Sequence, residues 1–75
     1  MDPLIAQFGR NVARARARAG LTQEELQDRS GVEASEIWRI ENGKVNVTIR
    51  RLSRLAKELN MSPGELLDGT FEESV

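Results

Sequence analysis

Three side chains that can bind by hydrogen bonding or stacking fall together on one face of a short predicted helix. At about 100° per residue around a helix axis, Ser35, Trp38 and Arg39 point away from the side that carries Ile37 and Ile40. An arginine can bond guanine through two hydrogens, a serine can donate or accept, and an indole can contact a thymine methyl group. This face therefore has the chemistry needed to read base edges in DNA.

The alternative interpretation of this face is an ordinary solvated helix surface. Trp38 favours a binding surface, because a tryptophan exposed to water is costly to leave without a partner, whether DNA or another subunit. Ala34, in the first turn of the same helix, can add a methyl contact to a base. We therefore predict base contacts from Ala34 together with the three polar and aromatic residues.

Groups suited to phosphate flank the predicted reading helix on both sides. Before it, a helix that begins at Thr22 offers backbone N–H groups, with the side chain of Gln23 beside them. After it, further candidates follow on a loop and at the start of the next helix: Asn42, Lys44, Asn46 and Arg50. Among the cations we expect Lys44 first and Arg50 second to contact phosphate, while most other cations of that helix solvate its surface.

Arg16 differs from the other cations, because it lies beside Val12 and Ile5 at the rim of a predicted buried face. An unpaired guanidinium at such a position would be costly, so a carboxylate partner is expected. Glu41, near the core side of the reading helix, is the candidate partner. We predict a structural ion pair between Arg16 and Glu41.

The elements that must position these groups are all predicted to be helices, since no stretch shows the alternation of a strand. Thr22 with Glu25, and Ser62 with Glu65, form capping boxes. Five helices are expected to begin after Asp2, Thr22, Glu33, Thr48 and Ser62, and to end near Gly20, Gly31, Asn42-Gly43, Asn60 and Asp68-Gly69. The fourth carries a predicted apolar stripe of Ile49, Leu52, Leu55, Ala56 and Leu59. We predict one all-α domain over residues 1–75, with a core of about 4–68 and a frayed tail at 69–75.

The small size of the chain favours self-association. Seventy-five residues without cysteine must rely on one apolar core, which is usually marginal at this length. A homodimer is therefore expected, and its surface is predicted in the last predicted helix and the residues after it: Leu66, Leu67 and Phe71. The alternative is that these side chains close the core of the monomer. For Leu66 the two interpretations are equally favoured, and closure of the core is favoured more for Leu67 than for Phe71.

The formal net charge of −1 hides a strong partition along the chain. Residues 1–20 carry +3, residues 21–43 carry −4, residues 44–60 carry +4 and residues 61–75 carry −4. Patches govern phosphate contact more than totals do, although a total near zero predicts weak nonspecific attraction to DNA.

Composition also limits the function classes. The chain has no His or Cys and no glycine-rich phosphate loop, and it has too few residues to enclose a usual active-site pocket. We expect no enzyme activity, cofactor, metal or small-molecule ligand. No apolar run reaches the length of a membrane span or signal peptide, so a cytoplasmic protein without a membrane partner is expected. The main alternative is a protein-interaction module, such as a small antitoxin, in which Trp38 and its acidic neighbours bind a partner protein.

Taken together, the residues resemble the Xre/Cro-type helix-turn-helix family of phage repressors and small bacterial regulators. The pattern covers about Val12 to Leu67, and the segments that carry it are LTQEEL (21–26), SGV (30–32), Ile37, RIENGK (39–44), Leu52, Leu55-Ala56 and Leu59. The resemblance implies a five-helix, lambda-repressor-like fold and a transcriptional regulator, often a repressor. It also implies a major-groove helix beginning near Ala34, phosphate contact at Gln23, an internal Arg16–Glu41 pair and two-fold dimers on palindromic operators.

Some positions of this chain point to one subfamily or depart from the usual pattern of the family. The short chain and its Asn46-Val47-Thr48 loop, in place of a proline-containing one, look like the controller proteins of restriction-modification systems. Gln27 stands where a small residue, usually alanine, lets the second and third helices approach. Glu33 replaces the common Ser or Thr cap, and Trp38 replaces a small polar residue. These departures bear on the base contacts and on the angle between the two helices more than on the fold.

Overall fold

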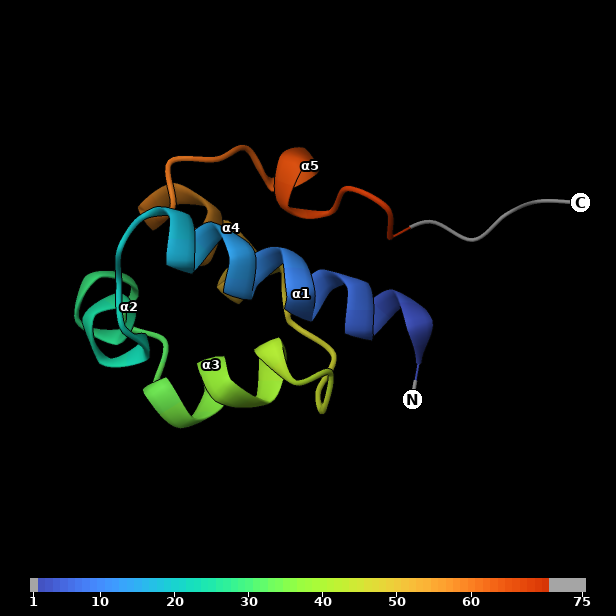
Figure 1. Cartoon of the computed structure of the whole chain (residues 1–75), viewed down its shortest axis with the longest axis horizontal. Coiled ribbons are helices and arrows are strands. Elements are labelled where there is room, and N and C mark those ends of the chain that lie inside the picture. The colour runs from blue at the N-terminus through green and yellow to red at the C-terminus, as the bar shows by residue number, and fades with distance from the viewer. Residues whose placement is uncertain (1, 71–75) are drawn as a thin grey trace, which may run out of the picture.

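The computed structural model describes residues 2–70, and this part of the chain folds into five helices without a strand (Figure 1). They are α1 (Pro3–Arg18), α2 (Gln23–Ser30), α3 (Ala34–Glu41), α4 (Ile49–Glu58) and α5 (Pro63–Leu66). The predicted all-α class and its five helices are therefore confirmed. None of the helices in residues 2–70 is long and apolar enough to cross a membrane.

Four of the five helices, α1, α2, α4 and α5, begin at the side-chain caps that were predicted. The Asp2 carboxylate accepts a hydrogen bond from Leu4 N–H at 2.8 Å, and Pro3 follows as the first residue of α1. Thr22 and Ser62 both complete their capping boxes, and the Thr48 hydroxyl accepts from the first turn of α4. These local bonds satisfy N–H groups that a helix start leaves without partners.

The helices end at left-handed residues or at turns. Gly31 and Gly43 have φ of 76° and 67°, and Asn60 has φ of 56°, as the predicted stops after α2, α3 and α4 require. The predicted end of α5 is too late, because the helix stops at Leu66. A tighter turn follows, in which Asp68 N–H donates to the Glu65 carbonyl oxygen.

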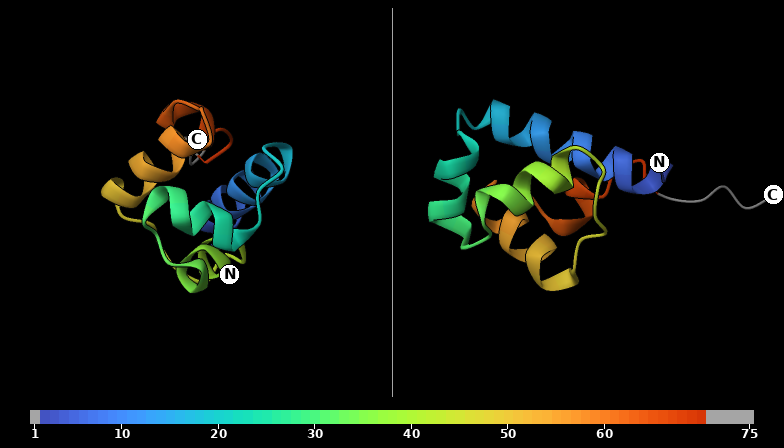
Figure 2. Two further views of the ribbon diagram at one scale, coloured as in Figure 1. Left: turned by 90° about the vertical axis from the view of Figure 1, so that its left-hand side faces the viewer. Right: turned by 90° about the horizontal axis from the view of Figure 1, so that it is seen from below.

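A single apolar core is built from all five helices of the described chain. Its buried members recur at helical spacing and are Phe8, Val12, Ala15, Leu21, Leu26, Val32, Ile37, Ile40, Leu52, Leu55, Ala56, Leu59 and Leu66. In Figure 1, α1 crosses the middle of the molecule, with α3 on one side of it and α5 on the other. The view from below shows α3 in the foreground (Figure 2), so one side of α3 faces outward.

The close approach of α1 and α3 depends on Gly9. A Cβ atom at this position would lie 2.3 Å from the Ile40 carbonyl oxygen and 2.8 Å from that of Glu41. Only glycine lets the backbones come this near. The crossing fixes the end of α3 against α1, and no sequence pattern indicated this role for Gly9.

Candidate nucleic-acid interface

α3 presents two chemically different sides. Ile37 and Ile40 are 0% and 1% exposed, so they anchor the helix in the core. Trp38 is 50% exposed, and Ser35 and Arg39 are also exposed. The outward orientation predicted for these three side chains is therefore present, while their contact with DNA stays a prediction.

The other predicted base contact, Ala34, is half-buried at the start of α3. Its N–H donates to Gln27 Oε1 of α2 at 2.7 Å. Glu33 occupies the N-cap position but forms no capping hydrogen bond through its side chain. A side chain of α2 thus holds the start of α3 by a hydrogen bond, whereas the side chain of the residue before α3 forms none there.

Charges on the outward side link α3 to α4. One oxygen of the Glu36 carboxylate lies 3.9 Å from Arg39 Nη1, and the other lies 3.9 Å from Arg51 Nη1. At this distance the pairs are loose, and the Arg39 side chain is 61% exposed. The guanidinium of Arg39 can therefore leave Glu36 for a ligand at little cost.

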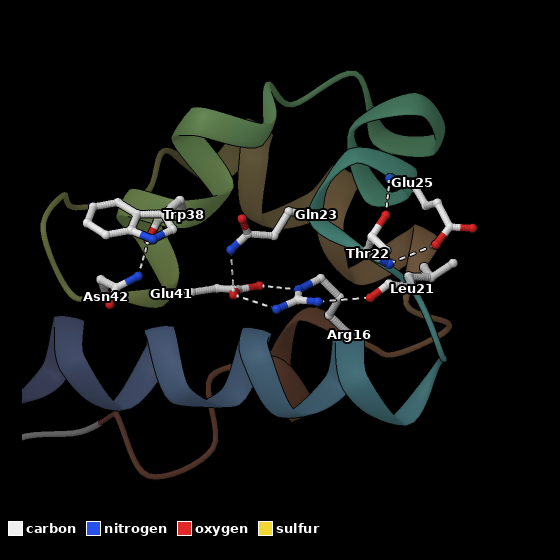
Figure 3. Close-up of polar contacts among 8 residues, drawn as sticks. All are labelled: Arg16, Leu21, Thr22, Gln23, Glu25, Trp38, Glu41 and Asn42. Atoms are coloured by element: carbon white, nitrogen blue, oxygen red, sulfur yellow. Dashed lines mark hydrogen bonds and ion pairs between the residues drawn. The ribbon is translucent and has the colours of Figure 1, made fainter.

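The predicted ion pair holds the other end of α3. Arg16 Nε and Nη2 donate to the two carboxylate oxygens of Glu41 at 2.6 and 2.9 Å, and Arg16 Nη1 donates to the Leu21 carbonyl oxygen at 2.9 Å (Figure 3). The Glu41 side chain is only 6% exposed. The hydrogen bond that Arg16 donates to Glu41 raises the pKa of Arg16, so its guanidinium stays charged. It joins α1, the turn before α2, and α3.

The predicted phosphate contacts differ in how they are placed. Asn42, Lys44, Asn46 and Arg50 are all exposed, along the segment from the end of α3 into α4. The Asn42 amide donates to the Trp38 carbonyl oxygen at 2.8 Å. Arg50 lies in the first turn of α4 beside Arg51.

Two of the phosphate candidates at the start of α2 are engaged within the chain. The Thr22 hydroxyl accepts from Glu25 N–H at 3.0 Å, and Thr22 N–H donates to Glu25 Oε1 at 2.9 Å. Gln23 is half-buried, and its Nε2 donates to Glu41 Oε1 at 3.0 Å (Figure 3). Gln23 therefore adds a third helix to the ion pair, a role that no sequence pattern indicated.

The three residues predicted for a dimer surface have different outcomes in the structure. Leu66 is 0% exposed and belongs to the core, so its assignment to a dimer contact is wrong; α5 turns this side chain inward to close the monomer. Leu67 is 38% exposed. Phe71 lies outside the described residues. Leu67 borders a hollow of about 160 Å³, which is also lined by Leu4, Ile5, Phe8, Val45, Asn46, Val47 and Thr70.

Ile49 was predicted to belong to the apolar stripe of α4, and this prediction is wrong. It is 84% exposed, whereas Leu52 and Leu55 are buried. The reason is geometric, because Ile49 falls at the edge of the stripe by helical rotation and opens the first turn, where no preceding turn covers it. An apolar side chain thus stands beside Arg50 on the surface.

A family model described as a helix-turn-helix domain matches residues 7–68, which contain α2 to α5 and most of α1. The chain is also 42% identical over 64 residues to a protein of Sinorhizobium fredii named as the HTH-type transcriptional regulator y4dJ. That alignment covers 85% of this chain and 83% of the relative.

Solved structures with the same arrangement include two restriction-modification controller proteins. C.AhdI from Aeromonas hydrophila matches with a TM-score of 0.80 and 34% identity, over 83% of this chain and 94% of that one. C.Esp1396I matches with a TM-score of 0.82 and 26% identity over 100% of both chains. The clp gene regulator ClgR from Corynebacterium glutamicum matches with a TM-score of 0.83 and 26% identity, over 88% of this chain and 70% of that one.

Proposed function

This chain belongs to the helix-turn-helix family of DNA-binding transcriptional regulators, and we propose that it binds palindromic operators in double-stranded DNA as a homodimer. The observation that carries the proposal is the outward side of α3, where Ser35, Trp38 and Arg39 stand clear of the core. A helix with such a side can enter the major groove, where base edges are distinguishable.

In this proposal, bases and backbone are contacted by different groups. Ala34, Ser35, Trp38 and Arg39 read bases. The exposed residues after α3 hold phosphates, led by Lys44 and Arg50, within a segment of net charge +4. Phosphate contacts of this kind fix the register of the protein on the duplex and carry little sequence information. The proposed phosphate contacts also include Asn42, Asn46, Thr22 and Gln23.

We further propose that the regulated locus is a restriction-modification locus and that the protein acts in the cytoplasm. The likeness to C.AhdI and C.Esp1396I supports the first part, since both match over most or all of this chain. The short Asn46-Val47-Thr48 loop between α3 and α4 supports it too.

A protein-interaction module is the second candidate, because the half-exposed indole of Trp38 would also suit a protein partner. The two candidates differ in their response to salt. DNA binding releases counterions from phosphates and weakens steeply as salt rises, whereas docking through an apolar face does not. Retention on mixed-sequence DNA at low and at moderate salt therefore separates them.

Selection of duplexes from a random oligonucleotide pool by the full-length protein tests the proposal. We expect enrichment of two-fold related half-sites about 34 Å apart, which is one helical turn. A pool that stays random after selection, together with salt-insensitive retention, would overturn the proposal in favour of a protein partner.

A further inference from the structure

We propose that Gln27 of α2 is a positioning residue that sets the orientation of α3 and, through it, the sequence preference of the reading face. The inference rests on the proposed function and names a residue that touches neither a base nor a phosphate in it. Gln27 is half-buried, and its side chain crosses from one helix of the motif to the other.

The hydrogen bond from Ala34 N–H to Gln27 Oε1 holds the start of a helix that has no side-chain cap of its own. Ala34 is the first residue of α3, so its N–H has no partner within the helix. A side chain at the N-cap position usually accepts from the N–H of the second or third helical residue and so holds the first turn, but Glu33 forms no capping bond. The start of α3 is thus held from α2 at 2.7 Å rather than by its own cap.

The rest of the turn between α2 and α3 is fixed separately. The buried Ser30 hydroxyl donates to the Leu26 carbonyl oxygen at 2.7 Å and accepts from Val32 N–H at 3.1 Å. These bonds reach only as far as Val32. Gln27 provides the next bond along the chain, at the residue where α3 begins.

α3 is therefore anchored at both ends by side chains from other helices. Glu41 fixes its last turn through Arg16 and Gln23, and Gln27 fixes its first turn. Ala34 and Ser35 lie at the end held by Gln27. A base contact requires a side chain held within about 0.5 Å of its productive position. Releasing this end of α3 should therefore weaken the preference of Ala34 and Ser35 for particular bases.

The test compares variants that keep or remove the acceptor oxygen at position 27. Gln27→Met keeps the chain length without an acceptor, and Gln27→Glu keeps the acceptor. The readout is the ratio of affinities for the selected operator and for single-base variants of it at positions facing Ala34 and Ser35. We expect Gln27→Met to reduce this ratio roughly tenfold, the effect of one hydrogen bond, and Gln27→Glu to preserve it. Binding to mixed-sequence DNA at low salt should be the same for wild type and Gln27→Met.

Amide hydrogen exchange of Ala34 in the free protein provides a second readout. Exchange should be about tenfold faster in Gln27→Met than in the wild type, and unchanged in Gln27→Glu. Glu33→Gln is a matched control, since residue 33 makes no capping bond and both readouts should stay as in the wild type. If Gln27→Met does not fold in a thermal melt, Gln27→Asn replaces it, because its amide is one methylene too short to reach Ala34.

The outcomes separate this inference from the proposed function. A wild-type protein without any sequence preference contradicts the proposed function itself. A wild-type protein that discriminates, with a Gln27→Met variant that discriminates equally well, overturns only the role of Gln27, even if Ala34 exchange is faster. A uniform loss of affinity on every duplex overturns it as well.

Discussion

Arg39 is the residue on the outward side of α3 whose chemistry is most selective for a base. Its guanidinium can bond guanine through two hydrogens, and its side chain lies mostly in solvent with only a loose pair to Glu36. Glu36 is also close to Arg51 of α4, so the carboxylate keeps a cationic neighbour when Arg39 turns toward DNA.

Replacing Arg39 tests the division between base and phosphate contacts. Arg39→Ala should cost about 1–3 kcal/mol at the selected operator and relax the preference at one base position. Lys44→Ala is the matched control, expected to lower the salt slope by about one without changing preference. Titrations of both variants on operator and mutated duplexes measure the difference. Equal weakening by Arg39→Ala on all sequences would assign Arg39 to phosphate instead.

Single-residue roles could be predicted from sequence where helical rotation alone decides them. The outward direction of Ser35, Trp38 and Arg39 follows from rotation relative to two buried isoleucines. Gln27 could not be assigned in this way. It departs from the usual small residue, which suggested altered packing, but its bond to a backbone group seven residues away depends on the angle between α2 and α3.

The capping boxes of α2 and α5 make two helix starts sensitive to acid. The backbone N–H of Thr22, and then its hydroxyl, lower the pKa of Glu25, and Ser62 lowers the pKa of Glu65 in the same way. A lowered pKa in the folded state means that the unfolded chain binds the proton more tightly. The stabilisation is therefore present above the ordinary glutamate pKa and is lost as pH falls through the lowered value.

This acid sensitivity can be measured by thermal unfolding between about pH 7 and about pH 3. The wild type should lose more stability over this range than the double variant Glu25→Gln/Glu65→Gln, whose amides can still accept the capping bonds. Parallel pH curves for the two proteins would show that the carboxylates do not contribute as charged caps.

Gly9 makes the contact between α1 and α3 dependent on a missing side chain. Gly9→Ala would place a methyl group against two backbone carbonyl oxygens that cannot move aside separately. We expect a loss of at least about 1–3 kcal/mol in the free energy of unfolding, measured in urea. Gly64→Ala in α5 is the matched control, because the atom nearest to a Cβ there, Ser62 Oγ, would be 3.9 Å away. Equal effects of the two substitutions would contradict the close approach.

Helix starts and most helix ends were predictable because their signals are local. Thr22, Thr48 and Ser62 each cap a helix through residues within three positions. The role of Gly9 was not predictable, since it depends on atoms more than thirty positions away. The exposure of Ile49 was not predictable for a related reason, because an edge position of a stripe is buried only if another element covers it.

Dimerisation requires a surface that the core of the monomer does not already use. Leu66 cannot provide it, because it is fully buried in the monomer. Leu67, by contrast, is partly exposed beside a hollow formed by the start of α1 and the loop between α3 and α4. An apolar rim next to a small hollow can accept the same residue of a second copy around a two-fold axis.

Leu67→Glu should therefore lower the sedimentation mass from that of a dimer to that of a monomer, while a thermal melt still shows a folded chain. A charge placed in an apolar contact costs several kcal/mol unless it is paired, and each 1.4 kcal/mol weakens association about tenfold. Ile49→Glu is the control for an exposed apolar residue elsewhere and should leave the mass unchanged. A dimer that persists in Leu67→Glu would remove Leu67 from the interface.

If the outward side of α3 meets DNA, Trp38 reports on the contact directly, because it is the sole tryptophan of the chain. Its fluorescence can be followed with a collisional quencher as the selected operator is added. We predict that the half-exposed indole becomes protected from the quencher in step with binding, and less so on a scrambled duplex at equal occupancy. Binding of the operator with Trp38 as accessible to the quencher as in the free protein would contradict the account.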